Sequence, residues 1–225
     1  MKTRSIITVL LSVLLLVQCK KDKAIDADSY PYQFMFLSEE YEPFNYHDNG
    51  ELTGLGPEIL KSICNKYDIP FSVNVLSWDD AYNQALQNDN AVLFSTVLNS
   101  TRKDLFKWAG PYTSIDWYFY SPAENPVHVS SLEEAKQLNS IGVIQDYSIT
   151  QYLIEEGFNN LVYVQDNKEG FQKLFLGEID LFPSNRISAE ASLEESGLTY
   201  YVLKPELHIL TDMVYFAFNK SVPDY

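Results

Sequence analysis

The fold class follows from residues 141–182, which read IGVIQDYSITQYLIEEGFNNLVYVQDNKEGFQKLFLGEIDLF. Three short apolar segments in this stretch are typical of buried strands: 141–144, 161–164 and 179–182. Two further segments lie between them, 148–156 and 169–176, and each is followed by a glycine, which commonly ends a helix. Strands that alternate with helices in this way predict an α/β fold.

The rest of the chain continues the alternation. Upstream, we expect strands at 32–37, 71–76 and 91–94, helices at 57–67 and 78–86, and a turn at 48–50. Downstream, we expect a helix at 132–138 that begins with a capping box of Ser131 and Glu134, a helix at 188–195, and strands at 199–203 and 213–218.

Two similar-sized lobes are expected to meet near 115–122, where 117–120 is interpreted as an extended crossover. A return of the chain to the first lobe near 209–218 would complete a two-strand hinge. We therefore predict lobe 1 at 31–116, lobe 2 at 117–209, and a return to lobe 1 at 210–225.

The N-terminus is typical of a secretory signal. Lys2 and Arg4 precede an apolar run at 6–17, which as a helix spans about 18 Å and is too short for the roughly 30 Å hydrocarbon core of a membrane. The run ends at Leu16-Val17-Gln18-Cys19, which is similar to a bacterial lipobox. We expect a signal peptide at 1–18, lipidation of Cys19 and a polar tether at 19–30. The alternative is an ordinary secretory signal whose cysteine is incidental.

Composition excludes several classes of function. The 225 residues include 16 Lys and Arg against 31 Asp and Glu, a net charge of −15, which disfavours binding to nucleic acid. An anionic small ligand is still allowed, because the potential inside a pocket can oppose the net charge. Cys64 lies on the apolar face of its expected helix and is interpreted as a buried structural residue.

Catalytic and metal-binding motifs are missing from the sequence. GxSxG, HExxH, CxxC, GxGxxG and P-loop patterns do not occur, and the three histidines, His47, His128 and His208, have no partner at metal-ligand spacing. Paired acids such as Glu39-Glu40 are interpreted as solvated surface. We therefore predict a protein that is not an enzyme and has no cofactor or metal.

Aromatic residues are unusually frequent, with 16 Tyr, 13 Phe and 3 Trp. Aromatic walls with a few polar groups are typical of clefts for small ligands, and an arginine fork matches a carboxylate. The alternative is that most of these aromatic residues belong to the core.

Ordered short motifs resemble the bacterial extracellular solute-binding proteins, family 3, over about residues 31–224. In the first half they are Tyr41-Glu-Pro-Phe44, Gly50-Glu-Leu-Thr-Gly54, Pro57-Glu-Ile-Leu60, Trp78-Asp-Asp-Ala-Tyr82, Leu93-Phe-Ser95, Arg102 and Phe106-Lys-Trp-Ala-Gly-Pro111. In the second half they are Gly142-Val143, Leu174 to Asp180 and Tyr215-Phe-Ala-Phe218.

The resemblance implies a two-lobed clamshell, each lobe a small mixed sheet flanked by helices, that closes on a small solute by hinge motion. It implies that Arg102 holds a carboxylate of the solute. Backbone groups at Ser95, Thr96 and Val97 would assist, and a helix N-terminus at Tyr147 and Ser148 would face the same cleft. Further ligand contacts are implied for Tyr41, Phe44, Trp78 and Asn185.

The sequence departs from the family pattern at the expected site. Val97 replaces a common Thr, and Asp146 and Tyr147 replace a small Gly and a hydroxyl residue. Asn185 replaces an acid that often pairs with the ammonium group of the ligand, and an unpaired buried ammonium is costly. These changes put an ordinary α-amino acid in doubt and leave another carboxylate-bearing or polar, partly aromatic solute, or a degenerate site.

Family members usually continue past a strand like 213–218 with helices that complete the first lobe, whereas this sequence stops at Tyr225. Either the chain is truncated or the protein does without that cover.

Three functions remain open. The first is a lipid-anchored receptor in the periplasm or at the cell surface, which passes a solute to an ABC-type membrane permease or reports it to a membrane sensor. The second is a ligand-free interaction module. The third is a dehydratase-like enzyme on the same fold, for which Asp146 and Glu40 are the first candidate carboxylates.

Overall fold

A computed structural model describes residues 33–224 of the chain. The strands are β1 (Met35–Glu39), β2 (Tyr46–Asp48), β3 (Glu51–Thr53), β4 (Val73–Leu76), β5 (Ala91–Val97), β6 (Phe106–Pro122), β7 (Ile141–Ile144), β8 (Leu161–Val164), β9 (Phe182–Asn185) and β10 (Leu203–Asn219). The helices are α1 (Leu55–Lys66), α2 (Trp78–Gln87), α3 (Leu132–Ala135), α4 (Ser148–Glu155), α5 (Asn167–Leu176), α6 (Arg186–Glu195) and the 3-10 turn η2 (Tyr200–Val202).

The expected signal peptide at 1–18, the lipidation of Cys19 and the tether at 19–30 all lie outside the described residues. Within 33–224, no helix combines the length and the apolarity that a membrane crossing requires.

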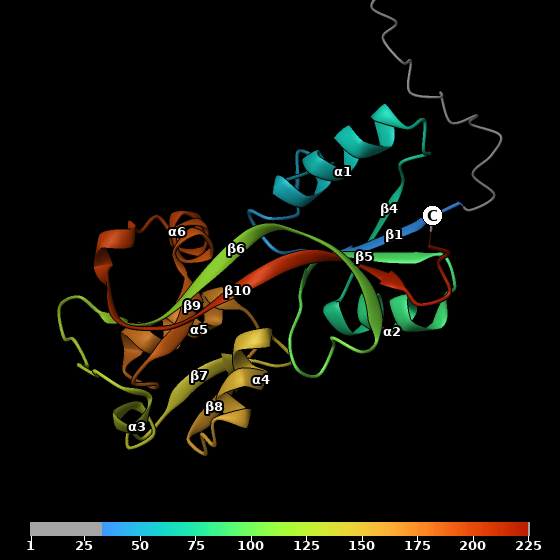
Figure 1. Cartoon of the computed structure of the whole chain (residues 1–225). Coiled ribbons are helices and arrows are strands. Elements are labelled where there is room, and N and C mark those ends of the chain that lie inside the picture. The colour runs from blue at the N-terminus through green and yellow to red at the C-terminus, as the bar shows by residue number, and fades with distance from the viewer. Residues whose placement is uncertain (1–32, 225) are drawn as a thin grey trace, which may run out of the picture.

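Two long antiparallel strands hold the molecule together. β6 and β10 are each 17 residues long, and they run side by side from one half of the molecule into the other (Figure 1). They belong to a six-stranded mixed sheet with the order β4-β1-β5-β10-β6-β9, in which β1 is parallel to its two neighbours. The predicted α/β class and two-strand connection are confirmed.

Long strands were not expected at these positions. The sequence predicted a short crossover at 117–120 and two separate strands at 199–203 and 213–218. The first lies within the much longer β6. The prediction at 199–203 is wrong except at its last residue, because Tyr200–Val202 form the 3-10 turn η2, whereas β10 begins at Leu203 and runs through 213–218 to Asn219. The register between β6 and β10 shifts three times, between Pro205 and Leu207, between His208 and Leu210, and between Val214 and Phe216. Each shift interrupts the alternation of inward and outward side chains. The sequence pattern therefore predicts several short strands in place of one long strand.

Lobe 1 comprises β1, β4, β5, the hairpin of β2 and β3, α1, α2, and the ends of β6 and β10 that pair near β5 (Figure 1). One apolar cluster lies beneath α2 and includes Leu37, Ala81 and Leu93. A second lies beneath α1 and includes Phe94 and Cys64, which is 1% exposed. Cys64 is therefore a core residue, as its position in the sequence predicted.

Lobe 2 comprises β7, β8, β9 and helices α3 to α6 (Figure 1). Its β7 and β8 form a separate parallel pair, which meets the chain before β9 through a single bridge between Ile141 and Leu181. The strand predicted at 179–182 therefore begins three residues later, at Phe182, where the chain reaches β6. Gly170 of α5 packs directly on the Phe182 ring, which leaves no space for a Cβ.

The capping box at α3 is formed in part. Ser131 Oγ accepts a hydrogen bond from the Glu134 backbone N–H at 3.2 Å, as predicted, but the Glu134 carboxylate accepts from Ser130 instead of Ser131. The helix itself ends at Ala135, earlier than the predicted residue 138.

Candidate functional site

A small cavity lies between the two lobes, against β6 of the connection. Its volume is about 30 Å³, which is room for one or two water molecules. The walls are formed by Glu39, Tyr41, Trp78, Ser95, Val97, Arg102, Ile115, Trp117, Asp146, Tyr147 and Ser148. These residues come from both lobes, so the structure shows the lobes closed on each other.

Arg102 is the buried cation of this cavity. It is 3% exposed, its guanidinium lies 4.6 Å from the Trp78 ring centre and 5.7 Å from that of Tyr82, and its Nη2 donates to the Asp146 carbonyl at 2.9 Å. Burial lowers the pKa of Arg102. Within 33–224 no Asp or Glu side-chain oxygen lies within 4.0 Å of the Arg102 guanidinium, the limit for an ion pair. The remaining N–H donors of Arg102 therefore lack an anionic partner.

Tyr41 and Tyr147 form an aromatic wall from opposite lobes. Their ring centres are 5.8 Å apart in an edge-to-face arrangement, and Phe44 stacks on Tyr41 at 5.1 Å from outside the cavity. Burial raises the pKa of both tyrosine hydroxyls, so they are neutral hydrogen-bonding groups at ordinary pH.

The end of β5 presents alternate side chains to the cavity. Ser95 and Val97 line it, whereas Thr96 points to the other side of the strand and is fully buried. Ser95 has a positive φ of 57° and shares a 2.9 Å hydrogen bond with the Tyr112 hydroxyl.

Asn185 lies beside the cavity, where its side chain makes hydrogen bonds within the protein. It caps α6 by accepting from the Ser188 N–H at 2.9 Å, and its Nδ2 donates to the Tyr41 hydroxyl at 2.9 Å. Its side chain is 3% exposed and does not line the cavity. Seven of the ten site residues expected from the sequence line the cavity: Tyr41, Trp78, Ser95, Val97, Arg102, Tyr147 and Ser148. The other three do not reach the cavity: Phe44, Thr96 and Asn185.

Asp212 of β10 is a site residue that the sequence did not reveal. Its Oδ2 accepts from Ser148 Oγ at 2.6 Å and from Trp117 Nε1 at 2.9 Å, so it fixes two walls of the cavity. Burial raises the pKa of Asp212, and those two hydrogen bonds and nearby Arg102 oppose the rise. No motif marked it, since only the pairing of β10 with β6 brings it to the cavity.

Glu39 at the end of β1 is the second such residue. The interpretation of Glu39-Glu40 as solvated surface holds for Glu40, which is exposed and bonded to His47, and is wrong for Glu39, which lines the cavity. Burial raises the pKa of Glu39 to about 8, although Arg102 lowers it. Nothing in the sequence distinguished Glu39 from the exposed Glu40 beside it.

Direct contacts hold the lobes together outside the cavity. Asn99 Nδ2 donates to Gln151 Oε1 at 2.7 Å, and Ser100 Oγ donates to Glu155 Oε1 at 2.6 Å. A third contact joins α6 to lobe 1, where Ser188 Oγ donates to the backbone carbonyl of Glu42 at 3.2 Å. Closure is therefore supported by protein–protein hydrogen bonds.

No metal-binding group is evident in the part of the chain that the structure describes, where no three His, Cys, Asp or Glu residues converge. Each histidine instead contacts a neighbouring side chain: His47 lies at Glu40, His128 at Glu206, and His208 at Thr211.

Two α/β lobes, two long connecting strands and a closed cavity between the lobes define a two-lobed binding-protein fold. The family model of the bacterial extracellular solute-binding proteins, family 3, matches residues 25–220, and the chain belongs to this family. No curated protein matches the chain by sequence.

Solved structures of similar fold include a histidine kinase sensor domain with similarity to periplasmic binding proteins, at 17% identity and a TM-score of 0.75; the match covers 84% of this chain and 83% of that one. An ancestral arginine-binding protein bound to arginine matches at 19% identity and 0.68, covering 84% and 85%. An ancestral amino acid-binding protein, a precursor of cyclohexadienyl dehydratase, matches at 15% and 0.66, covering 84% and 82%.

Proposed function

We propose that this protein is an extracytoplasmic receptor that captures a small polar, carboxylate-bearing solute between its lobes. The observation that carries the proposal is Arg102, a guanidinium that is 3% exposed and faces the cavity with no carboxylate partner among the described residues. A buried charge without a counter-ion is costly, and a carboxylate that accepts from the guanidinium fork removes that cost.

The other walls suit the same solute. Trp78 and Tyr41 offer aromatic faces, Tyr147 and Ser148 approach from lobe 2, and Ser95 adds a hydroxyl. Because the closed cavity holds only about 30 Å³, the solute must enter while the lobes are apart and must displace the present contacts. The hinge would be the paired β6 and β10, with lobe 1 at 31–116, lobe 2 at 117–209 and the return at 210–225.

Delivery to a membrane partner completes the proposal. An ABC-type permease or a membrane sensor would recognise the closed form, which alone joins the outer surfaces of both lobes. The family of extracellular solute-binding proteins supports the first partner, and the likeness to a histidine kinase sensor domain supports the second. A signal peptide at 1–18 and a lipid on Cys19 would place the receptor on a membrane in the periplasm or at the cell surface. This role requires no enzymatic reaction and no cofactor.

A ligand-free interaction module is the alternative that one observation favours. The lobes are closed by their own hydrogen bonds around a cavity that is too small for an amino acid. A dehydratase-like enzyme on this fold would need a cleft carboxyl of raised pKa, and Glu39, not Glu40, meets that description.

A thermal-shift screen separates these functions. The purified chain is screened against amino acids, small carboxylates and short peptides, because binding to the native state alone stabilises by about 2.7 kcal/mol at a hundred times the dissociation constant. We expect hits that disappear in Arg102→Ala and persist in Arg186→Ala, a matched control whose side chain is exposed and paired with Glu190. An empty screen on a cooperatively melting protein would favour the interaction module.

A further inference from the structure

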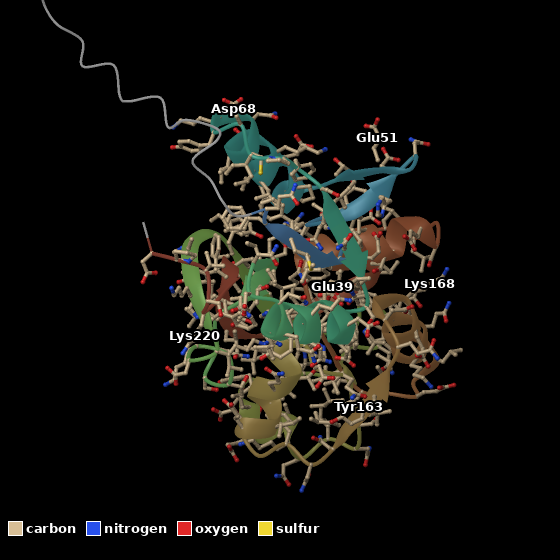
Figure 2. All side chains as sticks on the ribbon, turned by 90° about the vertical axis from the view of Figure 1, so that its right-hand side faces the viewer. Glu39, Glu51, Asp68, Tyr163, Lys168 and Lys220 are labelled. Atoms are coloured by element: carbon tan, nitrogen blue, oxygen red, sulfur yellow. The ribbon has the colours of Figure 1, made fainter. Side chains whose placement is uncertain are left out.

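Tyr147 is shared by three hollows between the lobes. It lines the inner cavity of about 30 Å³ and two neighbouring grooves of about 630 and 380 Å³, and no other described residue lines all three. Figure 2 shows the flank of the larger groove, with Glu39 of lobe 1 near the centre of the view and Tyr163 of lobe 2 below it. The Tyr147 side chain therefore separates the cavity at Arg102 from the space around it.

The backbone carbonyl of Asp146, the preceding residue, contacts the guanidinium of Arg102. Arg102 Nη2 donates to this oxygen across the lobe boundary at 2.9 Å, and Gln151 Nε2 donates to it at 3.4 Å. A carbonyl oxygen accepts from a guanidinium as one oxygen of a carboxylate does, but it brings no full negative charge. The contact thus takes the position that a solute carboxylate needs and leaves the charge of Arg102 without a counter-ion.

The loop that carries this carbonyl is held in place at both ends. Asp146 has a φ of 60°, in the left-handed region that is uncommon for a residue with a Cβ. After it, Ser148 Oγ donates to Asp212 Oδ2 at 2.6 Å, and Thr150 Oγ1 donates to the Ile144 carbonyl at 2.6 Å. The segment between β7 and α4 is therefore a built part of lobe 2 that contacts lobe 1.

The Tyr147 ring makes the second contact of this segment with lobe 1. It meets the Tyr41 ring edge-to-face with the ring centres 5.8 Å apart, a favourable arrangement for an aromatic pair. With this ring in place, the cavity beside Arg102 has room for only one or two water molecules. The ring thus fills space that a solute between the lobes would need.

One neighbouring group opposes the closed arrangement. Burial and the nearby Asp146 carboxylate raise the pKa of Asp79, which belongs to α2 of lobe 1. Closing the lobes therefore brings two like charges together, which weakens the closed state. The contacts of the segment with Arg102 and Tyr41 are partly offset in this way, so a solute can displace the segment.

We propose that the Asp146-Tyr147 segment is an internal occupant of the solute site, which closes the lobes without solute by placing its carbonyl on Arg102 and its ring against Tyr41, and which a solute must displace. This inference rests on the proposed function. An occupant that holds about nine-tenths of the molecules weakens the apparent affinity for solute about 10-fold. Loss of the Tyr147 ring should therefore strengthen binding, whereas loss of a solute contact would weaken it.

Tyr147→Ala tests the sign of this effect. Binding of phenylacetate, of 2-phenylethanol, which has the same ring but no carboxylate, and of the strongest carboxylate from the screen is measured by titration calorimetry. Tyr147→Ala should bind both carboxylates about 10-fold or more tightly than the wild type and should lose this gain when Arg102→Ala is added. Its affinity for 2-phenylethanol should change little.

Two matched variants control for the substitution itself. Tyr147→Phe keeps the ring and should bind both carboxylates like the wild type. Tyr163→Ala removes a tyrosine of the larger groove that is 55% exposed, and it should also bind like the wild type.

Small-angle X-ray scattering tests the closure itself. The radius of gyration of the wild type should not decrease when the strongest carboxylate is added, because the lobes are already closed. Unliganded Tyr147→Ala should have a larger radius of gyration than the wild type or Tyr147→Phe, and the same carboxylate should reduce it.

The outcomes separate the inference from the proposed function. The inference is wrong if the wild type contracts on binding, if the carboxylates bind Tyr147→Ala no more tightly than the wild type, or if 2-phenylethanol gains as much as phenylacetate. In each case the receptor function stands as long as a carboxylate binds the wild type and is lost in Arg102→Ala. If neither phenylacetate nor the broader screen gives binding to the wild type or to Tyr147→Ala, the receptor function is wrong, and the inference is wrong with it.

Discussion

Removing the charge of Glu39 should change how the stability of the protein depends on pH. Burial raises the pKa of Glu39 from 4.5 to about 8. The charged groups that face it are Arg102, which lowers this pKa, and Asp79, which raises it, while Tyr41 and Tyr147 stay neutral because their own pKa values are raised. The folded state therefore binds the Glu39 proton more tightly than the unfolded state does.

The sign of the effect follows from proton linkage. Between the unfolded and folded pKa values the unfolded chain binds fewer protons, so stability falls as pH rises, by about 1.4 kcal/mol per pH unit for one group. The loss begins near the unfolded pKa and is complete above about 8. From about pH 5.5 to about pH 7.5 the wild type should lose about 2–3 kcal/mol through Glu39 alone.

Urea denaturation at these two pH values checks this prediction. Glu39→Gln cannot ionise, so the free energy of unfolding of the variant minus that of the wild type should increase by about 2–3 kcal/mol from the lower to the higher pH. Glu51→Gln, at an exposed residue of the β2–β3 hairpin, controls for the general loss of an acidic side chain and should show a much smaller increase. If the free energy of unfolding of Glu39→Gln minus that of the wild type is the same at both pH values, Glu39 is not a buried, unpaired carboxyl in the folded state.

Three further substitutions test the packing and the closure. Asn99→Ala removes the 2.7 Å bond to Gln151, and it should shift the lobes apart, seen as a larger radius of gyration in small-angle X-ray scattering of the unliganded protein. Gly170→Ala forces a methyl group against the Phe182 ring and should cost about 1–3 kcal/mol in urea denaturation. Asp212→Ala removes the oxygen that accepts hydrogen bonds from Ser148 and Trp117 and should cost about 1–3 kcal/mol by the same method; an unchanged midpoint would mean that these bonds contribute nothing.

Local signals accounted for much of the fold. Gly177 ends α5 in the left-handed conformation with a φ of 70°, and Ser131 caps α3, because both effects act within one helical turn. The lengths of β6 and β10 escaped prediction, since their pairing joins residues about a hundred positions apart and their bulges break the alternating pattern.

The sequence predicted those residues of the site that lie in recognisable motifs. Arg102 and Trp78 were expected from their place in an ordered set of motifs, and the structure brings them into one cavity wall. Asp212 and Glu39 carry no such mark, because a carboxylate in an acidic chain is indistinguishable from a surface residue until the strands place it. Asn185 was expected to face the ligand, yet its side chain is occupied by capping α6.

Tryptophan fluorescence offers the most direct test of carboxylate capture at Arg102. Trp78 and Trp117 line the cavity whereas Trp108 does not, so a Trp108→Phe background reports mainly on the site. Titration with the strongest carboxylate from the screen should give a saturable change that is lost in Arg102→Ala and kept in Arg186→Ala. A saturable change with the same affinity in Arg102→Ala would contradict the role of the buried guanidinium.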